Sequence, residues 1–411
     1  MASVTVVGGS LGGLMVANML LRAGHTVTVL EKAMGSLDGR GAGIVAHRPL
    51  LSVLARCGVA ADAVLGVAVQ ERVVLGTDGE VVARTDLPQM LTSWSRLYAL
   101  LRKVLPDSCY VQGASVIDVQ QTPSEVTATC ADGRAFTSDL LIASDGIRST
   151  VRNLVAPEVD VNYAGYVAWR GVCDEAVLSQ RTLCSVFNSF GFGLPPGEQL
   201  IGYPVAGANN SVQRGARRYN FVWYRPAPDD GHLQALMTDA DGVHHTQGLP
   251  PHKVSWKHLA HVRQAARDIL APQFAEILEK TAQPFLQPIY DCCSAQIAFG
   301  RVALMGDAAF VARPHVGMGV TKAAQDAVAL ADCIETWGGS AQALLNFQAQ
   351  RLREGQAIVQ RARQLGAYMQ SCGDATSSLQ RSAVEVMTQT AIDLSASDPS
   401  IDFSLDLATE R

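Results

Sequence analysis

One segment of the chain combines a carboxylate, a proline-fixed turn and a glycine-rich start of a helix. It reads Gly306-Asp307-Ala308-Ala309-Phe310, followed by Arg313-Pro314-His315-Val316-Gly317-Met318-Gly319-Val320. A carboxylate can hold the hydroxyls of a polyol chain, and the free N–H groups at a helix N-terminus favour negative charge. The segment therefore suits a ligand in which a polyol chain is attached to an electron-poor ring.

The amino end reads as strand, glycine turn, helix, strand and acid. Residues 4–7 are an uncharged β-rich run, and Gly8-Gly9-Ser10-Leu11-Gly12-Gly13 precedes an apolar helix at 14–21. A second strand, 26–30, ends in Glu31, which lies 23 residues after Gly8. That spacing is near the ~20 residues expected for an acid that binds a ribose. The pattern predicts a dinucleotide-binding unit, in which Ser10 replaces the second glycine and can donate its hydroxyl to a pyrophosphate.

Bulk composition excludes several classes of protein. A chain of 411 residues is long enough for two domains, and 48% hydrophobic with 17% charged residues is ordinary for a globular protein. A net charge of −5 without basic blocks argues against nucleic acid as a partner. No apolar run approaches the ~18 residues of a membrane span, and the start lacks the basic region of a signal peptide. Nine scattered cysteines favour reduced thiols and a cytoplasmic protein.

Five of the nine histidines gather in one segment: His244, His245, His252, His258 and His261. His258 and His261 could share a helix face, as metal ligands do, but no matching cysteine or carboxylate set accompanies them. We expect no metal site here, and interpret the cluster as a solvated loop and helix face.

Coarse patterning extends the organisation to the rest of the chain. Helices are expected at 49–57, 96–105, 255–270, 272–282, 319–337 and 341–369. Strands are expected at 116–121, 126–130, 134–137 and 140–143, and, in an aromatic sheet, at 166–171, 184–188, 200–205 and 219–225. The Ser/Asp-rich stretch 372–411 is interpreted as a loosely packed tail.

Three glycine–acid segments occur in a characteristic order: residues 8–13, Asp145-Gly146 and Gly306-Asp307. This trio resembles the single-component FAD-dependent aromatic hydroxylases over most of residues 1–330. Segments 163–172, 220–224, 236–239 and 313–315 extend the resemblance and suggest a small hydroxylated N-heterocycle or phenol as substrate. They leave the ring open, because close relatives hydroxylate different rings.

The resemblance implies an α/β fold with a Rossmann-like FAD-binding domain, an inserted, mainly antiparallel β-sheet domain for substrate, and C-terminal helices. The FAD-binding domain would comprise 1–66, 94–160 and 284–335. The substrate domain would comprise 67–93 and 161–283, and the helices and tail 336–411.

The resemblance also implies which residues bind FAD: Gly8, Ser10, Leu11, Gly13, Glu31, Lys32, Ala42, Gly43, Arg96, Asp145, Gly146, Asp307, Pro314, Gly317, Met318, Gly319 and Val320. Two positions depart from the family. Many members have Gln where Met318 stands and Asn where Thr321 stands, so backbone N–H groups would replace those amides near the flavin pyrimidine.

Candidates for contact with the substrate are His47, His315, Tyr203 and Tyr224. Histidine titrates near neutrality and can accept or relay a phenolic proton. Each residue also has a purely structural alternative: the tyrosines as packing within a sheet, and His47 as a helix cap.

By resemblance, NADH or NADPH reduces bound FAD, O₂ adds at the flavin C4a, and the resulting hydroperoxide transfers OH to an electron-rich ring. The expected partner is a small aromatic substrate, with no nucleic acid and no membrane, and the sequence leaves a homodimer open. Two alternatives remain: a flavin-dependent reductase or dehydrogenase on the same scaffold, or a flavoprotein that binds an aromatic ligand without catalysis. O₂ consumption coupled to substrate-stimulated oxidation of NAD(P)H separates a monooxygenase from a reductase or dehydrogenase. A ligand-shifted flavin absorbance without turnover would indicate the non-catalytic flavoprotein.

Overall fold

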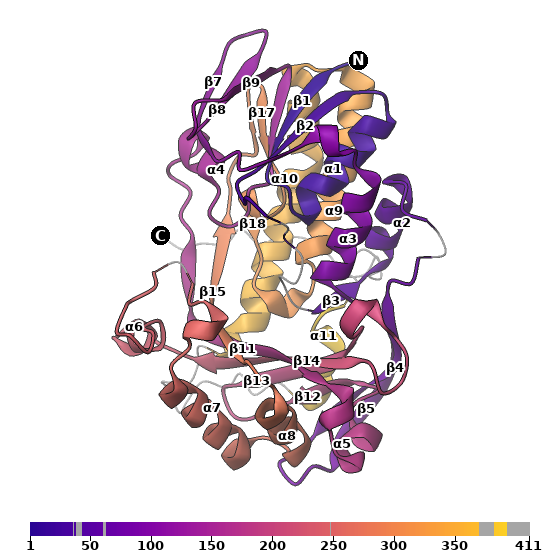
Figure 1. Ribbon diagram of the computed structural model, residues 1–411, viewed down its shortest axis with the longest axis vertical. Helices are drawn as coiled ribbons and strands as arrows, with labels where there is room; N and C mark the ends of the chain where they lie inside the picture. The colour runs from indigo at the N-terminus through magenta and orange to yellow at the C-terminus, as the bar shows by residue number, and fades with distance from the viewer. Residues whose placement is uncertain (36, 38–42, 61–62, 247, 370–381, 393–411) are drawn as a thin grey trace.

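The computed structural model describes residues 1–35, 37, 43–60, 63–246, 248–369 and 382–392. It is a mixed α/β protein with a six-stranded, a nine-stranded and a three-stranded sheet. In Figure 1 the six-stranded sheet lies at one end of the molecule and the nine-stranded sheet at the other, with the long helix α10 (Ala341–Gly366) extending between them. The α/β architecture expected from the sequence is confirmed.

The six-stranded sheet is parallel apart from one edge pair. Its strands, in spatial order, are β16 (Ala298–Phe299), β17 (Val302–Leu304), β10 (Leu140–Ala143), β1 (Ser3–Val7), β2 (Thr26–Glu31) and β6 (Tyr110–Gln112). Helices α1 (Leu11–Arg22), α2 (Arg48–Arg56), α3 (Trp94–Val104), α4 (Thr150–Val155) and α9 (Gly319–Trp337) belong to the same part of the molecule (Figure 1). A meander of β7 (Val116–Gln121), β8 (Val126–Cys130) and β9 (Ala135–Ser138) forms the three-stranded sheet.

The register of this sheet brings the three glycine–acid segments together. Val7 of β1 lies beside Ala143 of β10, and Ala143 lies beside Leu304 of β17. Each of these residues ends its strand, so Gly8, Ser144 and Met305 begin three loops at one edge of the sheet. That carboxyl edge is where ligands bind in open parallel sheets.

The nine-stranded sheet is antiparallel except where β12 meets β4. Its order is β18 (Phe310–Val311), β15 (Phe285–Cys293), β11 (Asn162–Asp174), β14 (Arg218–Pro226), β13 (Gln199–Val205), β12 (Phe190–Gly193), β4 (Gly66–Leu75), β5 (Val81–Ser93) and β3 (Gly43–Ala46). Helices α5 (Gln180–Ser185), α7 (Trp256–Ile269) and α8 (Pro272–Lys280) lie below it in Figure 1, and α6 (His232–Leu236) lies at one side.

Alternation along β14 gives this sheet two different faces. Tyr219, Phe221 and Trp223 join the core shared with α7 and α8. Val222 and Tyr224 join the opposite core, which also contains Tyr166 and Tyr203. The second face is directed toward the six-stranded part of the chain.

The sequence-based division into domains stays a proposal. β3 and β15 lie in residue ranges assigned to the cofactor domain, but both are strands of the nine-stranded sheet. Segments assigned to the cofactor domain therefore contribute strands to the sheet of the other domain.

Two sequence predictions are wrong. The strand expected at 184–188 is instead the end of α5 and a turn; Ser179 caps this helix, and its hydroxyl donates to Glu276. Part of the expected loose tail is also ordered: α11 (Ala383–Gln389) begins with a capping box formed by Ser382 and Glu385, and it buries Val386 and Met387. The rest of that stretch, 372–381 and 393–411, lies outside the described residues.

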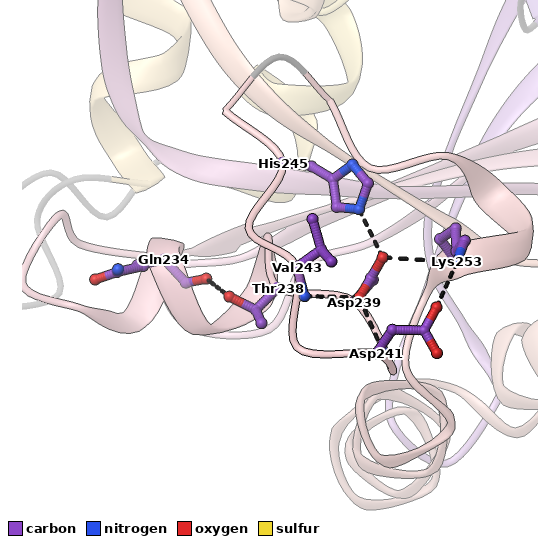
Figure 2. Close-up of polar contacts among 7 residues, drawn as sticks. All are labelled: Gln234, Thr238, Asp239, Asp241, Val243, His245 and Lys253. Atoms are coloured by element: carbon purple, nitrogen blue, oxygen red, sulfur yellow. Dashed lines mark hydrogen bonds and ion pairs between the residues drawn. The ribbon is translucent and has the colours of Figure 1, made fainter.

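The loop that carries His244 and His245 is organised by Asp239 (Figure 2). The carboxylate of Asp239 is almost fully enclosed and accepts hydrogen bonds from the backbone N–H of Asp241 and Val243 and from Nε2 of His245. These bonds, led by the one to His245, lower the pKa of Asp239 to about 2. Within the described residues, no three His, Cys, Asp or Glu side chains are arranged to hold a metal ion. The loop's own hydrogen bonds thus account for His245.

We expect Asp239→Asn to increase cleavage of this loop by a protease at pH 7. The amide lacks the negative charge that strengthens the hydrogen bond from His245. The folded-state pKa of Asp239 lies below its ordinary value of 3.8, so its stabilising effect is complete above about pH 4 and is lost toward pH 2. Pepsin cleavage of the unaltered loop should therefore rise across that window. Asp241→Asn, at an exposed carboxylate, is the control. Equal cleavage of both variants would contradict the role of Asp239.

No helix in the described part of the chain has both the length and the apolarity to cross a bilayer.

Candidate active site

The first loop at the sheet edge is shaped by glycines that no other residue could replace. Gly8 has φ +105°, and a Cβ there would lie 2.4 Å from the carbonyl oxygen of Ser144. A Cβ on Gly13 would lie 1.9 Å from the carbonyl oxygen of Gly8. Ser10 occupies the N-cap of α1, but its side chain makes no capping bond there. The N–H groups of the first turn of α1 are thus available to an anion.

Glu31 anchors this loop. Its two carboxylate oxygens accept hydrogen bonds from the backbone N–H of Gly9 (2.9 Å) and of Ala33 (2.8 Å), and the side chain is buried. Lys32 beside it is exposed. Arg96 lies in the first turn of α3 and donates from Nε to the carbonyl of Val64. Binding of a cofactor by these residues stays a prediction.

Asp145 is held by the start of the helix that follows it. It accepts hydrogen bonds from the hydroxyl of Ser149 (2.5 Å) and the N–H of Val151 (3.2 Å) at the start of α4. Burial raises the pKa of Asp145, and these bonds oppose that effect. Gly146 has φ +84° and open space where a side chain would lie. The carboxylate of Asp145 is therefore already engaged by the start of α4.

Asp307 has a different environment. Its side chain is 52% exposed, and its carboxylate lies 3.7 Å from Nζ of Lys322. The chain then forms a short turn at Pro314–Val316, passes through Gly317 at φ +67°, and enters α9 at Gly319. Among the described residues, no atom outside the neighbouring backbone lies within 4 Å of the position of a Cβ on Gly319. An exposed carboxylate and a helix N-terminus with open space beside it thus lie in one short segment, as the sequence predicted.

Met318 and Thr321, the two departures from the family pattern, both point inward. Met318 is buried against Ile358 and Leu365 of α10. The hydroxyl of Thr321 lies 3.2 Å from Nδ1 of His47. His47 occupies the N-cap of α2 without a side-chain capping bond, so its side chain links α2 to α9 rather than capping α2.

His315 is enclosed by three side chains from the nine-stranded sheet. Nδ1 lies 2.9 Å from Oε1 of Gln199, and Nε2 lies 2.9 Å from the hydroxyl of Tyr166. The centre of its ring lies 4.2 Å from that of Tyr224. The structure thus brings His315 and Tyr224 together, and adds Gln199 and Tyr166, which sequence reasoning missed because nothing in their spacing marks them.

Tyr203 of β13 lies beside Gly43, the first residue of β3 in the same sheet. Its ring packs 4.9 Å from that of Phe190, and a Cβ on Gly43 would lie 2.5 Å from the Tyr203 ring. Ala42, also predicted to contact the cofactor, lies outside the described residues.

Asn220 is a further candidate that sequence reasoning missed. It pairs with Tyr203 in the sheet, and its Oδ1 accepts the N–H of Gly43 at 3.1 Å. The side chain is buried, and its Nδ2 has no partner among the described residues. A buried donor without a partner next to a predicted ligand-binding loop marks a position for a ligand acceptor. An amide on a strand of the expected substrate sheet was the available signal.

A glycine-lined helix N-terminus followed by an acid at the carboxyl edge of a parallel sheet is typical of a Rossmann-like dinucleotide-binding unit. The chain belongs to the family described as FAD binding domain, which it matches over residues 1–181 and 251–362. Residues 163–291 match a second family, described as FAD binding domain-like.

Particular relatives narrow this class. The chain is 29% identical to 2,6-dihydroxypyridine 3-monooxygenase of Paenarthrobacter nicotinovorans, over 90% of this chain and 92% of that protein. It is 28% identical to aurachin C monooxygenase/isomerase of Stigmatella aurantiaca, over 89% and 88%. A solved 2,6-dihydroxypyridine-3-hydroxylase from Arthrobacter nicotinovorans superposes with a TM-score of 0.84, at 28% identity, covering 91% of this chain and 94% of the other. The chain is accordingly a flavoprotein monooxygenase of the aromatic hydroxylase class.

The residues present fit FAD. The α1 N-terminus suits a pyrophosphate, the exposed Asp307 suits ribityl hydroxyls, and the α9 N-terminus suits the electron-poor end of a flavin. Cβ atoms would obstruct the first loop at Gly8 and Gly13, which is why glycine occupies both positions.

Proposed function

We propose that the chain hydroxylates a small electron-rich aromatic ring, such as a dihydroxypyridine or a phenol, with FAD as cofactor and NADH or NADPH as reductant. The ring C–H becomes C–OH with one atom of O₂; the second atom leaves as water, and NAD(P)H is oxidised with uptake of one proton. One observation supports this most: the polar aromatic face formed by Tyr203, Asn220 and Tyr224 lies beside Gly43 and His315, both predicted to lie in the site.

FAD, when bound, supplies hydride acceptance and O₂ activation. The protein must hold it and exclude water. We assign the pyrophosphate to the first turn of α1, the ribityl hydroxyls to Asp307, and the negative charge of the reduced ring to the N–H groups of Gly319 and Val320.

On the substrate side, the residues act as hydrogen-bond donors. Burial raises the pKa of Tyr203 to about 12 and also raises the pKa of Tyr224, so both phenols stay protonated at neutral pH. Neither can serve as a general base there. Asn220 offers Nδ2 to an oxygen or ring nitrogen of the substrate. His47 is the candidate that accepts or relays the phenolic proton of the substrate.

His315 positions the aromatic face in this proposal. Its ring connects Gln199 to Tyr166 and packs on Tyr224, so the substrate would meet Tyr224 in an orientation fixed by His315.

We expect His315→Ala to retain FAD and to lower hydroxylation at least tenfold, because Tyr224 and Tyr166 lose the group that orients them. Product formed per NADH oxidised, with the flavin spectrum of the same sample, measures this. Tyr163→Phe, which removes a hydroxyl bonded to the Ala227 carbonyl elsewhere on the sheet, is the matched control. Unchanged turnover with bound FAD would exclude the role.

A screen of NADH and NADPH oxidation against hydroxypyridines and phenols tests the function itself. We expect one compound class to stimulate O₂ uptake together with a hydroxylated product. Stimulated reduction without O₂ uptake would favour a reductase or dehydrogenase. A ligand-shifted flavin spectrum without turnover would favour a non-catalytic flavoprotein.

A further inference from the structure

Lys322 is a buried lysine in the first turns of α9. Its side chain is 0% exposed, and its Nζ has no hydrogen-bond partner among the described residues. Its backbone N–H donates to the carbonyl of Met318, so the residue is a regular part of the helix. The sequence patterns that identified Asp307 and Gly319 gave no role to this position.

The neighbouring carboxylates explain why Lys322 lacks a close partner. Asp326, one turn further along α9, accepts from the N–H of Gly306 with one oxygen and from Nε of Arg351 with the other. Asp307 forms an ion pair with Lys322 at 3.7 Å, which is beyond hydrogen-bonding distance. The ammonium therefore faces the inner side of a carboxylate whose outer side is exposed.

This arrangement is electrostatically costly in the protein alone. A buried ammonium without hydrogen bonds loses hydration, and the positive end of the α9 dipole lies in the same turns. An anionic ligand beside this helix start would offset both costs. An aliphatic residue would fill the same position without them, so packing alone does not account for a lysine.

We propose that Lys322 is a cofactor-site cation: it orients the Asp307 carboxylate toward the ribityl hydroxyls of FAD and adds positive charge that favours the reduced, anionic flavin. The proposal rests on the FAD site described above. It supplies a charge near the helix start where Met318 and Thr321 replace the amides of other family members.

Lys322→Met tests the proposal, because methionine matches the side-chain length and removes the charge. We expect the apoprotein to keep or raise its melting temperature, since an unpaired buried charge is lost. FAD affinity should fall at least tenfold by titration of apoprotein. The affinity for reduced FAD should fall a further tenfold relative to the affinity for oxidised FAD. This difference corresponds to a shift of about 30 mV in the two-electron potential of the bound flavin.

Lys257→Met, at a lysine on α7 that packs over Trp256, is the control, with affinity and potential unchanged. A lower melting temperature with unchanged FAD affinity and potential would make Lys322 a packing residue and overturn the proposal. Should Lys322→Met fail to fold, Lys322→Gln serves the same comparison. Wild-type protein is titrated first: absence of FAD binding there would contradict the proposed function, whereas normal binding with an unaffected variant contradicts only this inference.

Discussion

Asp307→Ala is expected to yield folded protein that purifies without flavin. The carboxylate is half exposed and lies in a 3.7 Å ion pair with Lys322, so its removal disturbs little of the protein. Asp307 would make two charge-assisted hydrogen bonds to ribityl hydroxyls, at about 1.5–3 kcal/mol each. The loss of both would weaken FAD binding by roughly 100-fold or more. Absorbance of the purified protein and titration of apoprotein with FAD measure this.

Asp307→Asn separates charge from shape, because the amide can still accept one hydrogen bond. We expect it to bind FAD with intermediate affinity. A double-mutant cycle with Lys322→Met should be non-additive, since the two groups face each other. Asp332→Asn, at an exposed carboxylate of α9 that pairs with Arg56 of α2, is the matched control. A normal flavin spectrum in Asp307→Ala would remove this residue from the site.

Sequence patterns were most informative where a strand, a glycine and an acid follow one another. The dinucleotide unit, the turn before α9 and the antiparallel sheet all depend on local periodicity and turn chemistry, and these survive folding. The sequence correctly predicted that β1, β10 and β17 are parallel strands. Because their carboxyl ends lie at the same edge of the sheet, the three glycine–acid segments come together there.

The predictions that failed, and the residues that were missed, depend on contacts between distant segments. Gln199 and Tyr166 surround His315 from β13 and β11, and Asn220 reaches Gly43 from β14. The contacts with His315 have no signal in the sequence, and the amide of Asn220 on its strand does not by itself indicate that it reaches Gly43. The helix at Ala383–Gln389 was also missed, because it is too short to be stable alone and gains its stability from contacts with distant strands.

Arg72 is the group that holds this helix. The side chain is fully buried in β4 and donates to the carbonyl oxygens of Met387, Thr390 and Ala391 and to Oε1 of Gln89. Its guanidinium also lies 4.8 Å from the centre of the Phe190 ring. Burial lowers the pKa of Arg72 to about 9, which leaves it charged at neutral pH. The end of α11 supplies the negative partial charge that it needs.

The held segment reaches the site. The N–H of Ala391 donates to the carbonyl of His315 at 2.9 Å, and a Cβ on Gly317 would lie 2.6 Å from that of Ala391. Thr390 also lies beside Gln199, the partner of His315. Arg72 therefore stabilises the turn before α9 through Ala391, which lies on the same face of the sheet as His315.

Arg72→Met is expected to lower the free energy of unfolding by about 3 kcal/mol or more, since each buried carbonyl left without a donor costs about 1–3 kcal/mol. Denaturant titration measures this change. Limited proteolysis should show cleavage near residues 382–392 before the rest of the chain unfolds, because α11 loses its anchor.

Arg84→Met, at an exposed arginine on β5 that pairs with Glu71, should leave both measurements unchanged. FAD affinity should fall less than in Asp307→Ala, because Arg72 acts on the turn only through Ala391. Unaltered protection of residues 382–392 in Arg72→Met would show that packing of Val386 and Met387 holds α11 without the guanidinium.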